Sequence, residues 1–217
     1  MLQMRTRLLG LLAGLLASAG LTAPAQAHPH IWVTIESTVA YEKGGFSGFK
    51  HKWTFDEFYS AMAVEGLDKN QDGKYDREEL AELAQVNVAA LKDFSYFTFP
   101  RLSGQALKIA EPRDYWLEYN NGILALYFTL PLETPVLADA KGFSFAVYDP
   151  SFFIAFDLAK TERPVRLSDD APKGCALKLG APEKDQANVS ALGESLAAIS
   201  GVGVSFAKTM SVECAAP

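Results

Sequence analysis

The residues from Asp68 to Glu79 constrain this chain most, because they place oxygen-bearing side chains at a fixed spacing around a glycine. They read D-K-N-Q-D-G-K-Y-D-R-E-E and match the calcium-loop pattern D-x-[DN]-x-[DN]-G-x5-E at every specified position. Gly73 stands where the sharp turn needs a positive φ. The pattern predicts calcium ligands from side chains and, at Lys74, from the backbone carbonyl: Asp68, Asn70, Asp72, Lys74, Asp76 and Glu79. Because carboxylates this dense repel one another, we expect bound calcium to stabilise the loop.

Helical patterns flank this loop on both sides. Phe55–Gly66 predicts a short entering helix, and Arg77–Phe94 predicts a longer leaving helix with apolar residues near helical spacing. The sequence therefore predicts an EF-hand-like helix-loop-helix inserted at residues 55–95. Tyr75 occupies the position at which paired loops normally carry a small aliphatic residue, so a structural calcium ion is favoured and a regulatory one stays open.

Residues 1–27 have the pattern of a secretory signal peptide. Arg5 and Arg7 precede an apolar run at Leu8–Leu21, and Ala25-Gln26-Ala27 fits a cleavage site. The run is shorter than the roughly 20 residues that span a bilayer, and no later run approaches that length. We therefore expect a periplasmic protein that begins at His28 and has no membrane span after signal cleavage.

The net charge of the exported chain limits the kinds of partner that it can bind. Residues 1–27 hold two of the 20 Lys and Arg residues and none of the 26 Asp and Glu residues, so the exported chain has a net charge near −8. This net charge argues against nucleic acid as a partner and favours the binding of cations.

The chain has two cysteines. In an oxidising compartment we expect Cys175 and Cys214 to form a disulfide, with a free thiol or a metal thiolate as the alternative.

Alternating and apolar runs predict a β-rich chain after the signal peptide. Strands are expected at 31–41, 46–55, 96–99, 106–110, 115–120, 123–130, 143–148, 152–158, 176–179 and 202–214, with one helix at 189–199. The predicted fold class is α+β, mainly an antiparallel β-sandwich or open barrel. We expect a β-rich domain over residues 28–160 and a disulfide-tied C-terminal segment, 161–217, packed on the same domain.

All three histidines, His28, His30 and His51, lie close to the exported N-terminus. A free N-terminal histidine offers its α-amine and its imidazole to one metal, and a second imidazole completes a site suited to zinc, nickel, cobalt or copper. In the simplest hairpin register His51 lies opposite Glu36, roughly 20 Å along the strand from His30. Two interpretations stay open: a site at His28 and His30 completed by a carboxylate such as Asp149, or a polar pair of His51 with Glu36 or Asp56.

Further motifs accompany the acidic loop: H-P-H-I-W-V after the signal peptide, F-K-H-K-W-T-F-D-E-F-Y-S at Phe49–Ser60, F-S-Y-F-T-F at Phe94–Phe99, D-Y-W-L-E-Y at Asp114–Tyr119 and V-Y-D-P-S-F-F at Val147–Phe153. In this combination the chain resembles a bacterial family of uncharacterised exported proteins, a domain of unknown function. Its members are often labelled periplasmic component of an ABC-type transport system and are often encoded beside nickel/cobalt-type membrane transporters. The resemblance implies transition-metal handling at the bacterial envelope and directs attention to His28, His30, His51 and Asp149.

The sequence thus predicts a binding or accessory protein for a divalent transition metal, and not an enzyme. Calcium is the expected structural ion, and a membrane metal transporter is the expected partner. Two alternatives stay open. One is a calcium-stabilised protein-interaction module without a transition metal, and the other is a copper enzyme that holds Cu(II) in an N-terminal histidine brace at His28.

Overall fold

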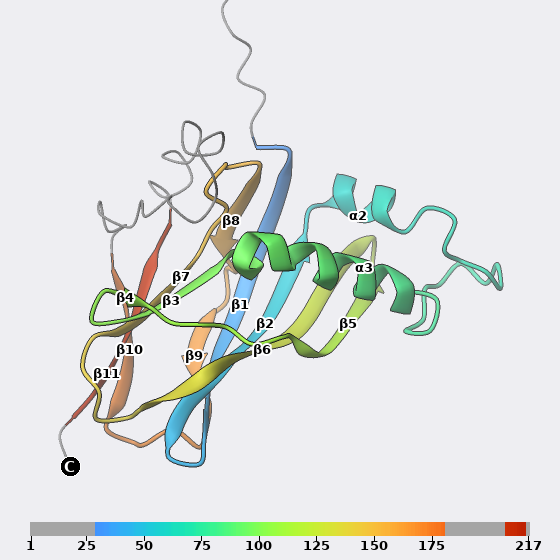
Figure 1. Ribbon diagram of the computed structural model, residues 1–217. Coiled ribbons are helices and arrows are strands. Elements are labelled where there is room, and N and C mark those ends of the chain that lie inside the picture. The colour runs from blue at the N-terminus through green and yellow to red at the C-terminus, as the bar shows by residue number, and fades with distance from the viewer. Residues whose placement is uncertain (1–28, 181–206, 216–217) are drawn as a thin grey trace, which may run out of the picture.

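The computed structural model describes residues 29–180 and 207–215, which form two β-sheets with helices beside the larger sheet (Figure 1). The helical elements are α2 (Glu57–Ala63), α3 (Ala81–Leu91) and the 3-10 helix η2 (Lys92–Phe97). The strands are β1 (Ile31–Glu42), β2 (Gly45–Phe55), β3 (Thr98–Leu102), β4 (Gln105–Ala106), β5 (Arg113–Asn120), β6 (Ile123–Leu137), β7 (Phe143–Val147), β8 (Ile154–Leu158), β9 (Val165–Leu167), β10 (Cys175–Gly180) and β11 (Thr209–Cys214).

The larger sheet has the order β5-β6-β2-β1-β8, with β9 also paired to β1, and the smaller sheet has the order β10-β11-β7-β3-β4. The pairings of β1 with β8 and with β9 are parallel, and the others are antiparallel. The expectation of a mainly antiparallel, sheet-rich α+β protein is confirmed. Over the described residues neither sheet closes into a barrel, since each strand order ends in two separate edges.

Aromatic side chains from both sheets meet in one core. The rings of Phe49 on β2 and Phe145 on β7 lie 4.6 Å apart between centroids, and those of Phe46 and Phe143 lie 5.6 Å apart. All four side chains are fully or almost fully buried. Burial of each such ring contributes roughly 1.5–3 kcal/mol. The inward face of β2 is therefore the apolar face that its alternating sequence predicts.

A β-bulge in the β1–β2 hairpin sets the register of the strands beyond it. The pairing shifts by one residue between Ala40 and Tyr41. Tyr41 lies opposite Phe46, Ala40 lies opposite Gly48, and Ser47 is the extra residue. Gly48 has a φ of +154°, and a Cβ added there would lie 2.4 Å from the backbone oxygen of Leu130. Only glycine fits this close approach to β6. The bulge determines which side chains of the two strands face each other.

The helices α2 and α3 begin and end within the predicted segments but are shorter than expected, whereas η2 extends to Phe97, beyond the predicted end at Phe94. Asp56 caps α2, because its Oδ1 accepts a hydrogen bond of 2.9 Å from the backbone N–H of Tyr59. Fully buried Ser60 joins α2 to the sheet by accepting a hydrogen bond of 2.9 Å from the backbone N–H of Leu124 on β6. The chain leaves the helical conformation before Gly66, which has a φ of +78°, and it forms a turn over 77–80 before α3 begins.

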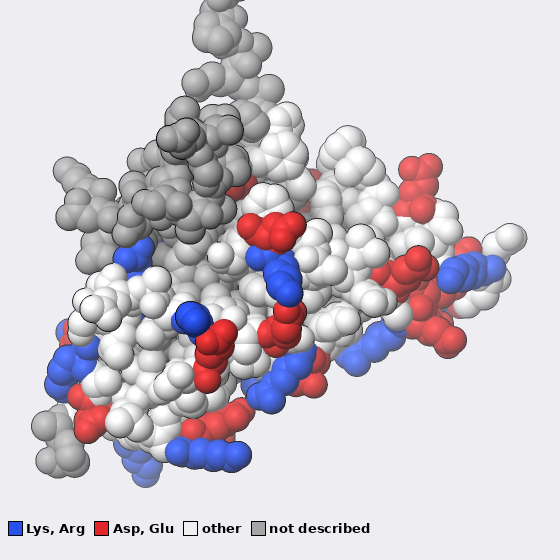
Figure 2. All heavy atoms as spheres, viewed as in Figure 1, with Lys and Arg blue, Asp and Glu red and all other residues white. Residues whose placement is uncertain are grey.

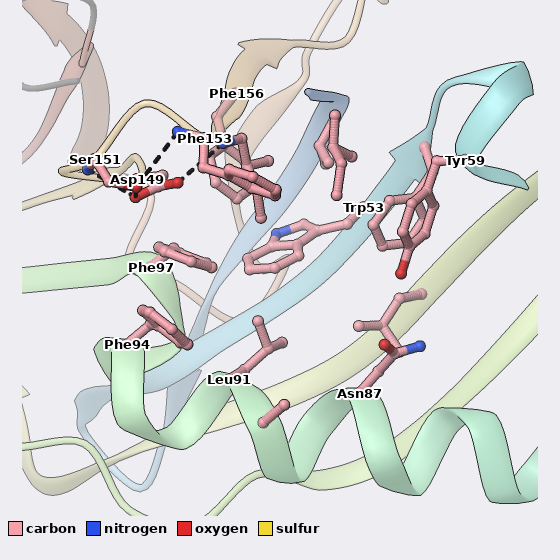
Figure 3. A pocket seen from close by; sticks show the side chains of 16 residues that line it. Trp53, Tyr59, Asn87, Leu91, Phe94, Phe97, Asp149, Ser151, Phe153 and Phe156 are labelled. Carbon is pink, nitrogen blue, oxygen red and sulfur yellow. Dashed lines mark hydrogen bonds between the residues drawn. The ribbon is translucent and has the colours of Figure 1, made fainter. Parts of the chain in front are cut away.

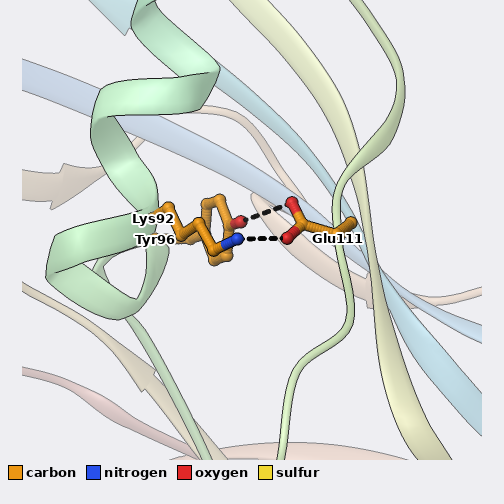
Figure 4. Close-up of polar contacts among 3 residues, drawn as sticks. All are labelled: Lys92, Tyr96 and Glu111. Carbon is orange, nitrogen blue, oxygen red and sulfur yellow. Dashed lines mark hydrogen bonds and ion pairs between the residues drawn. The ribbon is translucent and has the colours of Figure 1, made fainter.

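A polar contact fastens η2 to the segment before β5 (Figure 4). Lys92 Nζ donates a hydrogen bond of 2.5 Å to one carboxylate oxygen of Glu111, and the hydroxyl of Tyr96 donates one of 3.4 Å to the other. This hydrogen-bonded ion pair raises the pKa of Lys92 and lowers the pKa of Glu111. Because both groups are exposed, the pair adds little stability, and its effect is to position η2.

The C-terminal strands are tied together as expected. Cys175 and Cys214 lie opposite each other in the β10–β11 register and form a disulfide, and β11 pairs with β7. Of the strand expected at 202–214 the structure shows Thr209–Cys214, and the helix expected at 189–199 lies outside the described residues. The strand expected at 106–110 was too long, because β4 ends at Ala106 and only an isolated bridge at Ile109 follows.

Candidate functional site

The acidic loop between α2 and α3 is held by hydrogen bonds from its own backbone. The carboxylate of Asp68 accepts hydrogen bonds from the backbone N–H groups of Asp72 and Gly73, at 3.2 and 3.0 Å. Asn70 Oδ1 accepts from the N–H of Asp72 at 2.9 Å, and Asp72 Oδ1 accepts from the N–H of Lys74 at 2.8 Å. Gly73 has the predicted positive φ, at +77°. These side-chain oxygens therefore bend back over the loop instead of extending into solvent.

Glu79 joins the two ends of the loop. Its Oε1 accepts hydrogen bonds from the backbone N–H groups of Lys69 and Asn70, at 2.9 and 3.3 Å, and its Oε2 accepts one of 3.2 Å from Asp76. Asp76 in turn accepts a hydrogen bond of 2.9 Å from the N–H of Glu79. Within residues 29–180 and 207–215, no three His, Cys, Asp or Glu side chains are arranged to hold a metal ion. The loop oxygens are thus paired with N–H donors, which an incoming cation would have to displace.

Contacts with β5 fix the position of the loop. The ring of Tyr75 packs edge-on against Tyr119 at 4.9 Å between centroids. The guanidinium of Arg77 lies 4.5 Å from the centre of the Trp116 ring and 3.6 Å from a carboxylate oxygen of Glu118. Figure 2 shows acidic side chains gathered at the end of the molecule where this loop extends beyond the sheets. The loop is therefore an exposed acidic surface anchored to β5.

His51 lies in the core and not on the solvent-facing side of the hairpin. The bulge places it opposite Ser37, so the expected pairing with Glu36 is wrong; Glu36 instead lies opposite Lys52 and forms an ion pair of 2.9 Å with it. His51 Nδ1 is 2.8 Å from Ser37 Oγ, and its Nε2 is 3.4 Å from Thr98 Oγ1. Burial lowers the pKa of His51 from 6.5 to about 3, so the ring is neutral at physiological pH.

The structure does not bring His30 and His51 together. His30 precedes β1, and Ser37, which faces His51, is seven residues further along the strand, or roughly 23 Å. His28 lies outside the described residues. A site that joins all three imidazoles would need a different strand pairing from the observed one.

His30 instead contacts the segment that Asp149 organises. The backbone N–H of His30 donates a hydrogen bond of 2.9 Å to the carbonyl of Phe153, and the two rings lie 4.7 Å apart. Buried Asp149 accepts hydrogen bonds from the N–H and hydroxyl of Ser151, both at 2.8 Å, and from the N–H of Ile154 at 2.9 Å. The parallel pairing of β1 with β8 thus places His30 beside the Asp149 turn, whose carboxylate is already hydrogen-bonded.

An apolar pocket of about 360 Å³ lies between the larger sheet, α3 and the Asp149 turn (Figure 3). Sequence reasoning did not find it, because its walls come from segments far apart in the chain. One signal was available. Asn87 interrupts the apolar run V-N-V of α3, and it lines this pocket together with Trp53 of β2.

Comparison with known proteins assigns the chain to a family. A family described as "Protein of unknown function (DUF1007)" matches residues 13–214. This protein is a member of the DUF1007 family. An uncharacterised protein of Haemophilus influenzae is 30% identical over 208 residues, which cover 94% of this chain and 97% of the relative. A protein of Spirochaeta aurantia, named "Uncharacterized 15.5 kDa protein in trpE 3'region", is 32% identical over 117 residues, which cover 53% of this chain and 81% of the relative.

The match confirms that the sequence motifs belong to an uncharacterised bacterial family. The names of these two relatives state neither an activity nor a ligand. Among the helices of this DUF1007 protein in residues 29–180 and 207–215, none is both long enough and apolar enough to cross a membrane.

Proposed function

We propose that this DUF1007 protein is a non-enzymatic, calcium-binding protein of the bacterial periplasm, in which Ca²⁺ stabilises the loop at residues 68–79. The observation that carries the proposal is the folded arrangement of that loop. Its ligand-type side chains bend inward around Gly73, while buried Glu79 closes the ring. The leader at residues 1–27 supports export.

Calcium would act by replacing the N–H donors that now hold the carboxylates. Asp68, Asp72, Asp76 and Glu79 bring four carboxylates into one short loop, and a hard divalent cation neutralises them while taking six to eight oxygen ligands. Asn70 supplies a further side-chain oxygen, and Lys74 supplies its carbonyl. Binding only to the folded state would stabilise it by about 2.7 kcal/mol at a free Ca²⁺ concentration one hundred times the Kd.

Terbium luminescence tests this site directly, because Tyr75 lies within the loop and can transfer energy to a bound Tb³⁺ ion. We expect saturable luminescence that Ca²⁺ displaces, and calorimetry should give one Ca²⁺ per chain. Glu79→Gln should weaken Ca²⁺ binding by tenfold or more. Glu78→Gln is the matched control, because this neighbouring side chain is exposed and lies outside the predicted ligand set. Equal affinities of the two variants would refute the assignment.

We also propose that the protein serves a membrane transporter of a divalent transition metal, with the metal bound at His28 and His30 beside Asp149. The contact of His30 with Phe153 supports this, because it places the imidazole next to the turn that Asp149 organises. His51 is left out of the proposed ligand set, because both its ring nitrogens face hydroxyl groups in the core. The transporter itself rests on the family resemblance.

Calorimetric titration with Ni²⁺, Zn²⁺ and Cu²⁺ tests this second proposal. The protein that begins at His28 should bind more tightly than a version with one extra N-terminal residue, and His30→Ala should reduce the stoichiometry while His51→Gln leaves it unchanged. An interaction module without a transition metal predicts no change on removing His28 and His30. Oxidative turnover with Cu(II) at His28 would instead support a copper enzyme.

A further inference from the structure

The pocket beside α3 has the composition of a small-molecule site. Trp53 of β2 lies on one side of it, Leu91 at the end of α3 and Phe94 of η2 lie on the opposite side, and Phe153 and Phe156 form a third side (Figure 3). Phe55 of β2 also lines the pocket. Its volume of about 360 Å³ lies within the range of known ligand pockets. Phe94 and Phe153 are each 44% exposed, which indicates that the pocket opens between η2 and the Asp149 turn.

Two hydrogen-bond donors in this pocket have no acceptor among the described residues. They are the indole nitrogen of Trp53, whose side chain is 1% exposed, and the amide nitrogen of Asn87, whose Nδ2 atom is itself buried. Buried polar groups are nearly always hydrogen-bonded, so two such donors lining one cavity need an explanation. In Figure 3 the nitrogen-bearing edge of the indole faces the side of Phe153 and Phe156, whereas Asn87 extends from α3 on the opposite side.

The charges around the pocket limit the ligand further. Among the residues that the structure describes, no Lys, Arg or His lines it. The carboxylate of Asp149 does line it, and both of its oxygens accept hydrogen bonds from Ser151 or Ile154. An anionic ligand would therefore lose its hydration beside a buried carboxylate without gaining a cationic partner. A neutral ligand with an acceptor oxygen meets no such penalty and can accept a hydrogen bond from the indole N–H of Trp53.

We propose that this pocket binds a neutral, largely apolar small molecule of aromatic size, whose acceptor oxygen receives a hydrogen bond from the Trp53 indole N–H, while the Asn87 amide on the opposite side is available to a second acceptor atom. The aromatic walls supply the apolar contact area, and the donors orient the ligand. This site is separate from the acidic loop and does not depend on the function proposed above.

Three probes of the same heavy-atom count test the proposal on the purified protein: 2-acetylnaphthalene, 2-isopropenylnaphthalene and 2-naphthoate. The ketone offers a neutral acceptor, the alkene has nearly the same shape without one, and the carboxylate carries a negative charge. We expect the ketone to bind at least tenfold more tightly than the alkene, and the carboxylate to bind more weakly than either.

Indole N–H signals in an NMR spectrum of ¹⁵N-tryptophan-labelled protein locate the binding. The chain has three tryptophans, and Trp32→Phe and Trp116→Phe, both outside the core, identify the remaining signal as that of Trp53. The ketone should shift the Trp53 signal downfield in a saturable way. The alkene should shift it less, because it accepts no hydrogen bond from the indole N–H. Equal affinity for ketone and alkene, or equal shifts of all three indoles, would overturn the proposal.

Variants on α3 distinguish binding in the pocket from non-specific binding on the surface. Leu91→Trp fills the pocket and should abolish ketone binding, whereas Val86→Trp adds the same side chain at a position that is 59% exposed on the same helix and should leave binding intact. Asn87→Leu removes the donor on the opposite side of the pocket while keeping nearly the same shape, and it should leave the preference for the ketone over the alkene unchanged. Ketone binding that survives Leu91→Trp, or no ketone binding by the wild-type protein, refutes the site.

Discussion

His51 should make the stability of this protein depend on pH in a way that can be removed by one substitution. In the folded protein the ring is 3% exposed between Ser37 and Thr98, and burial lowers its pKa to about 3 from 6.5. The unfolded chain therefore binds a proton on His51 as the pH falls below 6.5, whereas the folded protein does not until about pH 3. Stability from this residue is fully present above pH 6.5 and is lost progressively as the pH falls.

The size of the effect follows from the two pKa values. Between pH 7.5 and pH 5, protonation of the unfolded state should lower the free energy of unfolding by about 2 kcal/mol. His51→Gln removes the titrating ring while keeping hydrogen-bonding groups for Ser37 or Thr98. The variant should be less stable at pH 7.5, because its amide does not match the ring geometry, but it should lose about 2 kcal/mol less than the wild type on acidification.

Urea unfolding at pH 7.5, 6 and 5, followed by tryptophan fluorescence with EDTA present, measures this difference. The carboxylates titrate in both proteins, so their contribution cancels when the two pH dependences are subtracted. His51→Asn is a second variant without a titrating ring and should behave as His51→Gln does. If the unfolding free energies of the wild type and the variants change by the same amount across this pH range, the assignment of His51 as a neutral, buried residue is refuted.

Further predictions concern stability. Gly48→Ala should cost on the order of 2–4 kcal/mol in urea unfolding, because its Cβ would lie 2.4 Å from the Leu130 oxygen, whereas Gly44→Ala, with a positive φ but no atom within 4 Å, should cost only about 1 kcal/mol. Reduction of the Cys175–Cys214 disulfide, whose cysteines are 39 residues apart, should lower the unfolding free energy by about 4 kcal/mol, and a Cys175→Ala/Cys214→Ala protein should be insensitive to reductant. Ser60→Ala should cost about 1–3 kcal/mol, because it leaves the buried N–H of Leu124 without an acceptor, and hydrogen exchange should show faster exchange at that amide; unchanged exchange would contradict the role given to Ser60.

Local spacing was enough to predict several parts of this protein. The alternation of Phe49, His51, Trp53 and Phe55 gives the inward face of β2, because side chains of a strand alternate between its two faces. The position of Gly73 in the acidic loop likewise predicts its positive φ, because a tight turn depends on residues only a few positions apart. The disulfide was predicted from the two cysteines together with the expectation of export.

Only the tertiary structure decided what these elements contact. The extra residue at Ser47 depends on the close approach of Gly48 to β6, and it moves His51 from Glu36 to Ser37. The neutral state of His51 and the pocket around Trp53 likewise depend on segments more than 40 residues away, such as Thr98 and Phe153. Sequence periodicity specifies which face of an element is apolar, but burial and unpartnered donors are set by whatever packs against that face, and this is determined by long-range contacts.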